Sequence, residues 1–221
     1  MQEEAHPKST GRTGAKTRER ILVEASRLLA THGYNGTTTR EIAKAVGISQ
    51  PSLFFHFATK QEIAETLYRL DIEPAVDRLE RLLDGEGVPA AKLHALLVGE
   101  LTYIFSSEHD LRVHMSYEVL NDPDLAEYRT LINRFDDMVR TLIRMAQADG
   151  TFAADDPWLA QQMVSGLLAR ATMFGEAAER PSFPEECATL MLRGMLIDRD
   201  ALPRIRDEAD HLVREYWPAG E

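Results

Sequence analysis

The sequence has little or nothing of several features that define common classes of protein. Its 221 residues include one cysteine, Cys187, which excludes a framework of internal disulfides and fits a reducing compartment. The N-terminus lacks the apolar core of a signal peptide, and charges such as Glu100 interrupt the apolar stretches. We therefore expect a cytoplasmic protein with no membrane-spanning segment.

Signatures of catalysis and of cofactor binding are also missing. The sequence has no phosphate-binding loop, no dinucleotide fingerprint, no Gly-x-Ser-x-Gly elbow and no Cys/His cluster at zinc-site spacing. Glu208 and His211 have the Glu-x-x-His spacing of di-iron bundles, but such a site needs a second copy, which is absent. We expect no catalytic residue, no metal and no cofactor. A helical-bundle enzyme is the least favoured alternative.

The apolar residues that are present predict an all-α fold. They make up 44% of the chain, which can fill a core, and they recur at helical spacing over about nine to ten segments. No stretch shows convincing strand alternation. Pro74 is expected to kink or interrupt a long helix that starts at Lys60. The other expected body helices lie at about 89–105, 111–120, 125–148, 157–178, 184–197 and 201–217.

Residues 37–60, TTTREIAKAVGISQPSLFFHFATK, predict two short helices joined by a tight turn. Thr38 and Glu41 have capping-box spacing, and Gly47 can adopt the left-handed conformation that ends a helix. Ser49 can cap the second helix, with Pro51 in its first turn. This is a helix-turn-helix, whose second helix is short enough for a DNA major groove. The apolar residues expected to form its small core are Ile21, Leu28, Ile42, Val46, Ile48, Leu53 and Phe57.

The predicted organisation is a mobile polar tail at 1–14, a DNA-binding domain at 15–61 and a helical body at 62–221. The formal net charge of −11 argues against nucleic acid, but it is unevenly distributed. Residues 1–60 contain nine Lys/Arg and five Asp/Glu, a balance of +4, which leaves −15 for residues 61–221. Together with the helix-turn-helix, this asymmetry favours DNA binding. Lys8, Arg12 and Lys16 could make the tail a minor-groove arm, although a plain mobile terminus is favoured.

The order of motifs in residues 18–68 resembles the N-terminal domain of the tetracycline-repressor (TetR) family of transcription regulators. The resemblance rests on the apolar first helix, the Gly33-Tyr34 turn, Ile42-Ala43, Gly47-Ile48-Ser49, Leu53, His56-Phe57 and Lys60. It implies a three-helix head followed by a helical body that binds an effector and dimerises.

The resemblance also implies roles for individual residues of the head. Thr38, His56 and Lys60 are expected at phosphates, and Thr38 and Lys60 lie at helix N-termini, which favour anions. Arg40, Gln50, Pro51 and Ser52 are expected at base edges, in agreement with their chemistry. Phe54 stands where the family usually has a phosphate-binding Tyr, so it either contacts DNA through its ring or packs in the head. For Phe54, Phe55 and Phe57 packing is favoured over DNA contact.

For the body, the resemblance implies a small-molecule pocket and a two-fold interface. We expect the homodimer to form through the helices at about 157–178 and 184–197, where Gly166, Gly175, Gly194 and Ala169 allow close approach. Polar or adaptable side chains on apolar body helices are the candidates for effector contact, and each of them could equally be ordinary packing. They are Tyr103, His114, Tyr117, Asn121, Arg134, Met138, Met163, Arg170 and Phe174.

These features predict a ligand-responsive repressor that binds a palindromic operator in double-stranded DNA as a homodimer. A hydrophobic or amphipathic effector would release it. The main alternative is a helical interaction protein whose head does not bind DNA. Random-duplex binding at low salt distinguishes the two.

Overall fold

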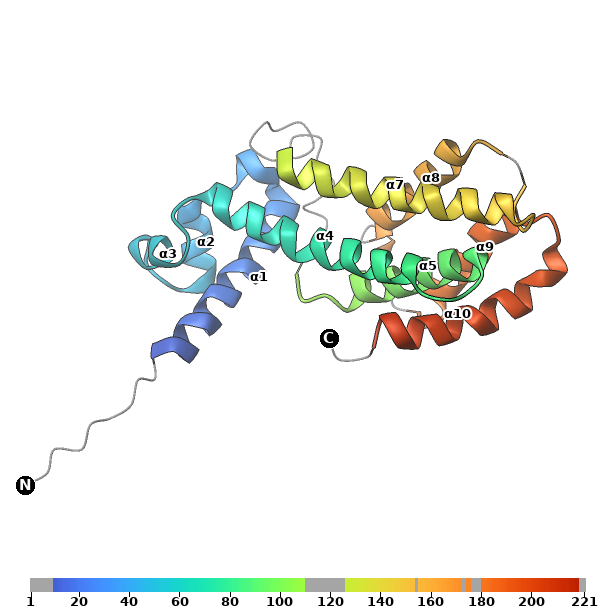
Figure 1. Ribbon diagram of the computed structural model, residues 1–221. Coiled ribbons are helices and arrows are strands. Elements are labelled where there is room, and N and C mark those ends of the chain that lie inside the picture. The colour runs from blue at the N-terminus through green and yellow to red at the C-terminus, as the bar shows by residue number, and fades with distance from the viewer. Residues whose placement is uncertain (1–9, 110–125, 154, 172–173, 176–179, 219–221) are drawn as a thin grey trace, which may run out of the picture. The chain divides into compact units, whose positions relative to one another are not determined.

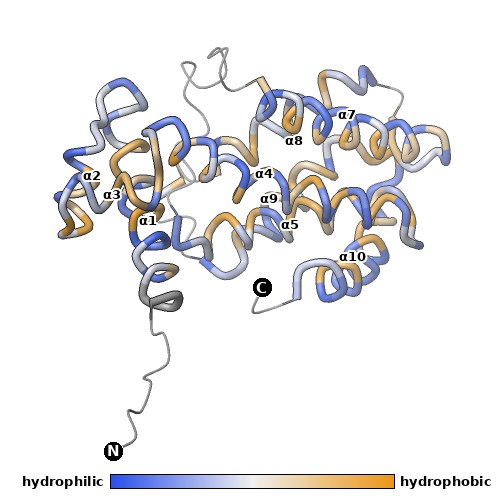
Figure 2. Tube along the Cα trace, turned by 60° about the vertical axis from the view of Figure 1, so that its left-hand side comes forward, coloured by the Kyte–Doolittle hydropathy of each residue, from blue (hydrophilic) through white to orange (hydrophobic). Residues whose placement is uncertain are grey.

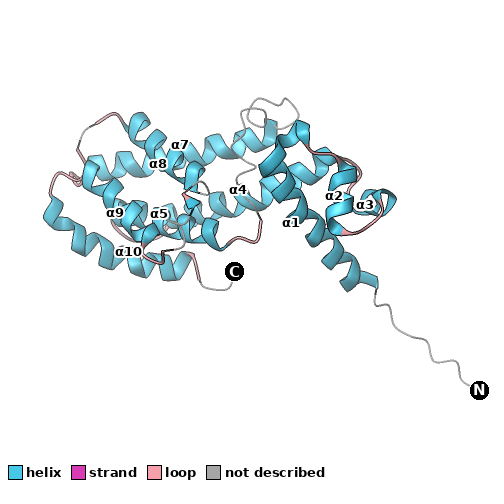
Figure 3. Ribbon diagram, turned by 180° about the vertical axis from the view of Figure 1, so that it is seen from behind, coloured by secondary structure: helices cyan, strands magenta, loops and turns pink. Residues whose placement is uncertain are grey.

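The computed structural model describes residues 10–109, 126–153, 155–171, 174–175 and 180–218, and its regular elements are helices (Figure 1). In chain order they are α1 (Thr10–Gly36), α2 (Thr39–Val46), α3 (Gln50–His56), α4 (Lys60–Asp84), α5 (Pro89–Ser106), α7 (Ala126–Ala148), α8 (Pro157–Arg170), α9 (Phe183–Met195), the 3₁₀ turn η5 (Arg199–Ala201) and α10 (Leu202–Tyr216). Figure 3 shows helices joined by loops throughout the described ranges, which confirms the all-α prediction. The helix expected at 111–120 lies outside these ranges.

The chain divides into two compact units. The boundary between the units and the start of the first helix both differ from the expected domain bounds. One unit contains Met1–Leu67 with Glu108–Val113, and the other contains Tyr68–Ser107 with His114–Glu221. The division falls after Leu67 rather than after residue 61, because the apolar side chains of the first turns of α4 are buried in the first unit. Helix α1 begins at Thr10, so the last residues of the expected tail are helical, and residues 1–9 lie outside the description.

The first unit, called the head from here on, is held by a small apolar core. Its fully buried side chains are Ile21, Leu22, Ala25, Leu29, Ile42, Ala43, Val46, Leu53, Phe57, Ile63, Ala64 and Leu67. Five of the seven expected core residues are among them, whereas Leu28 and Ile48 are only half-buried. The helical spacing of these residues places one apolar stripe on each of α1, α2 and α3, and the three stripes meet.

Helix α5 is the centre of the second unit, the body. Nearly all of its residues from Ala90 to Leu101 are buried, including the charged Lys92 and Glu100, and it contacts α7, α8, α9 and α10. Figure 2 colours much of α5 orange, as expected for a helix that is apolar on most sides. Pro74 is one residue expected to kink or interrupt a helix. Helix α4 continues through Pro74, so the expected interruption does not occur.

The C-terminal helix α10 closes one side of the body through close contacts with α5. The indole of Trp217 lies directly on Gly99, where even a Cβ atom would come within 2.2 Å of the ring. The Trp217 Nε1–H donates to Glu100, which accepts two further hydrogen bonds from Arg78. Among the described helices, none combines the length and apolarity needed to cross a membrane.

Candidate nucleic-acid interface

The helix-turn-helix forms as its capping residues predict. The Thr38 hydroxyl accepts a hydrogen bond from the Glu41 N–H (3.2 Å), and the Glu41 carboxylate accepts from both the N–H and the hydroxyl of Thr38 (2.8 Å each). These bonds lower the pKa of Glu41. Gly47 ends α2 in the left-handed conformation with φ 75°, and Ser49 Oγ accepts from the Ser52 N–H to begin α3. The predicted capping box and helix start are confirmed.

Gln50 ties the beginning of α3 to the beginning of α2. Its side-chain amide donates a hydrogen bond of 3.0 Å to the hydroxyl of Thr39. The bond limits the rotamers of Gln50 and fixes the direction of its carbonyl oxygen. It also holds the first residue of α3 beside Thr39, the neighbour of Arg40. Gln50 and Thr39 are 11 residues apart and lie on different helices, so no local sequence pattern predicts this contact.

The ammonium group of Lys60 is bonded to the protein backbone and is not a free cation at the surface. Its ammonium group donates to the carbonyl oxygens of Tyr34 (2.5 Å) and Thr37 (2.9 Å), and it lies 4.0 Å from the centre of the Tyr34 ring. Loss of solvent around the group lowers its pKa. Lys60 therefore fastens the turn after α1 to the start of α4, and these bonds use two of its three N–H donors.

The remaining predicted contacts are mostly on the surface of the head. Arg40, Pro51 and Ser52 are exposed, and His56 is half-buried with its ring 5.4 Å from that of Phe55. Phe54 is 44% exposed and Phe55 is 87% exposed. Helix α3 thus buries Leu53 but leaves most of its other side chains accessible.

The three phenylalanines Phe54, Phe55 and Phe57 differ in their burial. Phe57 is buried in the head core, as favoured, whereas Phe54 and Phe55 lie outside that core. The reason is register: Leu53 and Phe57 are four residues apart and share the inner side of the helix, so the two phenylalanines between them face outward.

Two arginines of α1 stabilise the helix-turn-helix instead of adding free charge. Arg20 donates to the carbonyl oxygen of Val46 at the C-terminus of α2, where a cation also complements the helix dipole. The guanidinium of Arg18 lies 4.4 Å from the centre of the Phe57 ring. Arg40 and Lys44 of α2 remain exposed and can meet phosphates or bases.

Six of the nine proposed effector residues lie in the part of the chain that the structure describes, and they have different surroundings. His114, Tyr117 and Asn121 lie outside the described residues. Tyr103 lies under the guanidinium of Arg78 (4.6 Å), and Arg134 forms an exposed ion pair with Glu80. Met138 packs against the body core, Arg170 is exposed, and Phe174 contacts the Phe183 ring.

Met163 is the candidate that lines a described cavity. The cavity has a volume of about 230 Å³ and is formed by α7, α8, α9 and the segment between α7 and α8. Its wall is largely apolar, with Ile143, Phe152, Leu159, Met191 and Met195. Its polar lining residues are Gln147, Asp155 and Asp156. Within the described ranges no group of three or more His, Cys, Asp or Glu side chains could hold a metal.

Comparisons with known proteins agree with this arrangement. Residues 21–67 match the family of bacterial regulatory proteins called the tetR family, and residues 86–173 match the family described as the C-terminal domain of tetracyclin repressor-like proteins. The HTH-type transcriptional repressor KstR2 of Mycolicibacterium smegmatis is 28% identical over 144 residues, which cover 64% of this chain and 70% of that protein.

Two solved structures are similar over most of the chain. AmtR of Mycobacterium smegmatis is 25% identical with a TM-score of 0.68, covering 96% of this chain and 97% of AmtR. AibR, in complex with isovaleryl coenzyme A and operator DNA, is 18% identical with a TM-score of 0.69, covering 81% of this chain and 98% of AibR. The two family models, the similarity to a curated repressor and the helix-turn-helix head together identify a DNA-binding transcription regulator. The chain belongs to the TetR family.

Proposed function

We propose that α3 reads operator DNA and that the body releases it when an effector binds. The observation that carries this proposal is the exposed surface of α3, which is capped by Ser49, tied to α2 through Gln50 and Thr39, and presents Pro51, Ser52 and Phe54 to solvent. Phe54 and Phe55 together form an exposed apolar patch on α3, which is typical of a surface that meets a partner. Base edges and thymine methyl groups are suitable partners for this set.

The proposed contacts divide into two groups. Arg40, Gln50, Pro51 and Ser52 face base edges, with Arg suited to guanine and the Gln amide suited to adenine. Thr38, His56 and Lys60 face phosphates, and Lys60 does so with the single donor left by its bonds to the turn. Phe54 meets DNA through its ring.

The proposed dimer uses α8 and α9. In the single chain these helices expose large apolar side chains that a partner would cover: Trp158, Leu159, Met163 and Leu190, the last of which is 74% exposed. Gly166 and Gly194 have no atom within 4 Å of a built Cβ, so both leave room for another helix. Two heads about 34–36 Å apart would read both halves of a palindrome.

Effector binding must favour a state that the operator does not fit. A ligand with equal affinity for both states would shift nothing, so the effector must bind the released state more tightly. KstR2 is described as a repressor, and AibR was solved with both an acyl-coenzyme A and its operator. By analogy we assign repression, a cytoplasmic location and no catalytic activity to this chain.

Selection of duplexes from random DNA with the full-length protein tests this function. We expect a palindromic consensus, and repeating the selection with a metabolite panel should identify a compound that lowers operator affinity. Failure of every compound to change the affinity would remove the ligand response but leave the DNA-binding claim. Turnover of a panel compound would instead revive an enzymatic function.

A further inference from the structure

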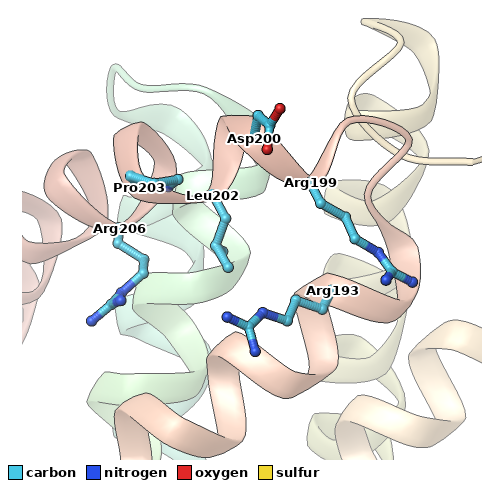
Figure 4. Close-up of a pocket in the computed structure, with 6 residues that line it drawn as sticks. All are labelled: Arg193, Arg199, Asp200, Leu202, Pro203 and Arg206. Carbon is cyan, nitrogen blue, oxygen red and sulfur yellow. The ribbon is translucent and has the colours of Figure 1, made fainter.

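The cavity of about 230 Å³ between α7, α8 and α9 has a wall that contains three methionines. They are Met163, Met191 and Met195, and we call this site the methionine cavity. It is separate from the larger hollow where α9, η5 and α10 meet (Figure 4), because the two have no lining residue in common. Methionine side chains are flexible and polarisable, so this part of the wall can adapt to the shape of a bound molecule.

Another part of the wall is fixed by backbone hydrogen bonds. The Ala153 N–H donates to the Met195 carbonyl oxygen (2.9 Å), and the Ile197 N–H donates to the Thr151 carbonyl oxygen (3.1 Å). Phe152 lies between these bonds, lines the cavity and is 2% exposed. The bonds join the segment after α7 to the end of α9, so the position of this wall does not depend on a bound molecule.

The polar side chains of the wall offer little to a negatively charged ligand. The Gln147 amide nitrogen donates to the carbonyl oxygens of Ala153 (3.0 Å) and Asp155 (2.8 Å), which uses both of its N–H groups. Asp156 Oδ1 accepts from the Trp158 N–H (2.9 Å) as the cap of α8. None of the described residues that line the cavity is Lys, Arg or His, so an anionic group would meet carboxylates and no side-chain cation.

The volume of the methionine cavity favours a small occupant. Sites for drug-sized ligands usually begin at about 300 Å³, whereas an apolar cavity of about 150 Å³ is enough to bind benzene. At about 230 Å³ this cavity has room for a molecule of the size of indole.

We propose that the methionine cavity is the effector site and that it binds a small, neutral, largely apolar molecule. The regulatory consequence rests on the proposed function. Leu159 and Met163 line the cavity, are 54% and 56% exposed, and also belong to the surface that we assign to the dimer. An occupant that moves these two side chains changes the dimer surface, and with it the fit of the two heads to the operator.

The test uses the full-length protein without DNA. It is titrated with indole, which is neutral, or with indole-3-carboxylate, which adds a negative charge to the same ring system. NMR of methionine labelled with ¹³C in the methyl group follows the binding, and the three signals are assigned with Met163→Leu, Met191→Leu and Met195→Leu. We expect saturable shifts of these signals with indole. The carboxylate should bind about tenfold more weakly or worse, because its charge would be buried without a partner.

Filling the cavity should remove the binding. Ala160→Leu should weaken indole binding about tenfold or more, because Ala160 lines the cavity and a larger side chain takes up part of its volume. Thr141→Leu is the matched control, since it adds a leucine at an exposed position of α7 outside the cavity. Circular dichroism checks that both variants fold. If Ala160→Leu does not fold, Gly194→Leu replaces it, because Gly194 also lines the cavity and has no atom within 4 Å of a built Cβ.

The proposal is overturned if indole gives no saturable shift, if the carboxylate binds as tightly as indole, or if the filling variant and Thr141→Leu bind indole equally well. Titrations below and above the dimer dissociation constant distinguish a ligand from a second copy of the chain. Loss of indole binding on dimerisation would mean that the partner fills the cavity, and the proposal would then be wrong.

Failure here is distinguishable from failure of the proposed function. Because no DNA is present, a negative result leaves operator binding by α3 unaffected. A compound that releases the operator without shifting the three methionine signals would keep the ligand response and reject this cavity as its site.

Discussion

The ammonium group of Lys60 donates a hydrogen bond of 2.9 Å to the backbone carbonyl oxygen of Thr37, 23 residues earlier in the chain. A second bond reaches the carbonyl of Tyr34, so one side chain joins the start of α4 to the turn after α1. The same ammonium is our proposed phosphate contact. Lys60 is thus given two tasks, and its substitution should affect both.

Lys60→Ala should destabilise the head and also weaken binding to all DNA sequences about equally. We expect a loss of about 1.5–3 kcal/mol in the free energy of unfolding, because hydrogen bonds from a charged donor are removed. Chemical denaturation followed by circular dichroism measures this loss. Lys44→Ala is the control: Lys44 is an exposed cation of α2, so its loss should lower DNA affinity without lowering stability. A Lys60→Ala protein as stable as the wild type would show that the two carbonyl bonds contribute nothing.

Phe54→Tyr should raise affinity for every duplex. The ring is 44% exposed, so an added hydroxyl can reach solvent or a phosphate without disturbing the core, and stability should stay within about 0.5 kcal/mol. One additional hydrogen bond to a phosphate is expected to improve binding by about 1.5 kcal/mol, roughly tenfold. Fluorescence anisotropy with operator and random duplexes measures the effect. Phe55→Tyr makes the same change one residue along, and an equal gain there would argue against a specific position for residue 54.

Much of the head could be predicted from the sequence because its signals are local. Thr38 and Glu41 lie three residues apart, and Ser49 directly precedes α3, so the caps that define both helices need no knowledge of the fold. The contacts that position the site are not local. Lys60 meets a turn 23–26 residues away, and Gln50 bonds to Thr39 across two helices, which spacing does not reveal.

The body was less predictable for a physical reason. Helical periodicity locates a helix and its apolar stripe, but it does not say which neighbouring helix covers that stripe. The sequence predicts Arg134 as a pocket residue, but in the structure it is an exposed ion-pair partner of Glu80. No sequence pattern marks Arg193 and Arg199, which line a hollow between α9, η5 and α10. Polar residues on apolar helices are therefore weak indicators of a binding site until the packing is known.

Gly194→Leu should weaken dimerisation without harming the fold of the single chain. No atom lies within 4 Å of a Cβ built at this position, and glycine is a poor helix former, so the substitution is expected to be neutral or stabilising in the protomer. A leucine would, however, hold a partner helix away from α9. Sedimentation over a range of protein concentrations measures the dimer dissociation constant. Thr141→Leu, at an exposed position of α7, is the control, and equal dimerisation of both variants would reject α9 as the interface.

His94→Gln should make the stability of the protein less dependent on pH. Burial lowers the pKa of His94, and the nearby Glu185 and Asp210 carboxylates, which raise it, do not compensate; Arg206 lowers it further. The folded protein therefore binds this proton less readily than the unfolded chain. The stability contributed by His94 is present above the ordinary histidine pKa and is lost as the pH falls below it.

Urea denaturation at pH 5, 6 and 7 tests this expectation. The unfolding free energy of the wild type should fall more steeply between pH 7 and pH 5 than that of His94→Gln. His211→Gln is the control, because His211 lies on the exposed side of α10. Parallel pH profiles for the wild type and His94→Gln would mean that His94 titrates as it does in the unfolded chain.

The most direct measurement of the central claim is the salt-dependent affinity of the full-length protein for a selected operator and for a random duplex, with Gln50→Ala in parallel. At low salt we expect both duplexes to bind the wild type, with the operator preferred by about 10³-fold or more. Gln50→Ala should lose about 1–3 kcal/mol on the operator and little on the random duplex, because its lost contact is to a base. The account is contradicted if the wild type binds neither duplex at low salt, or binds both with equal affinity.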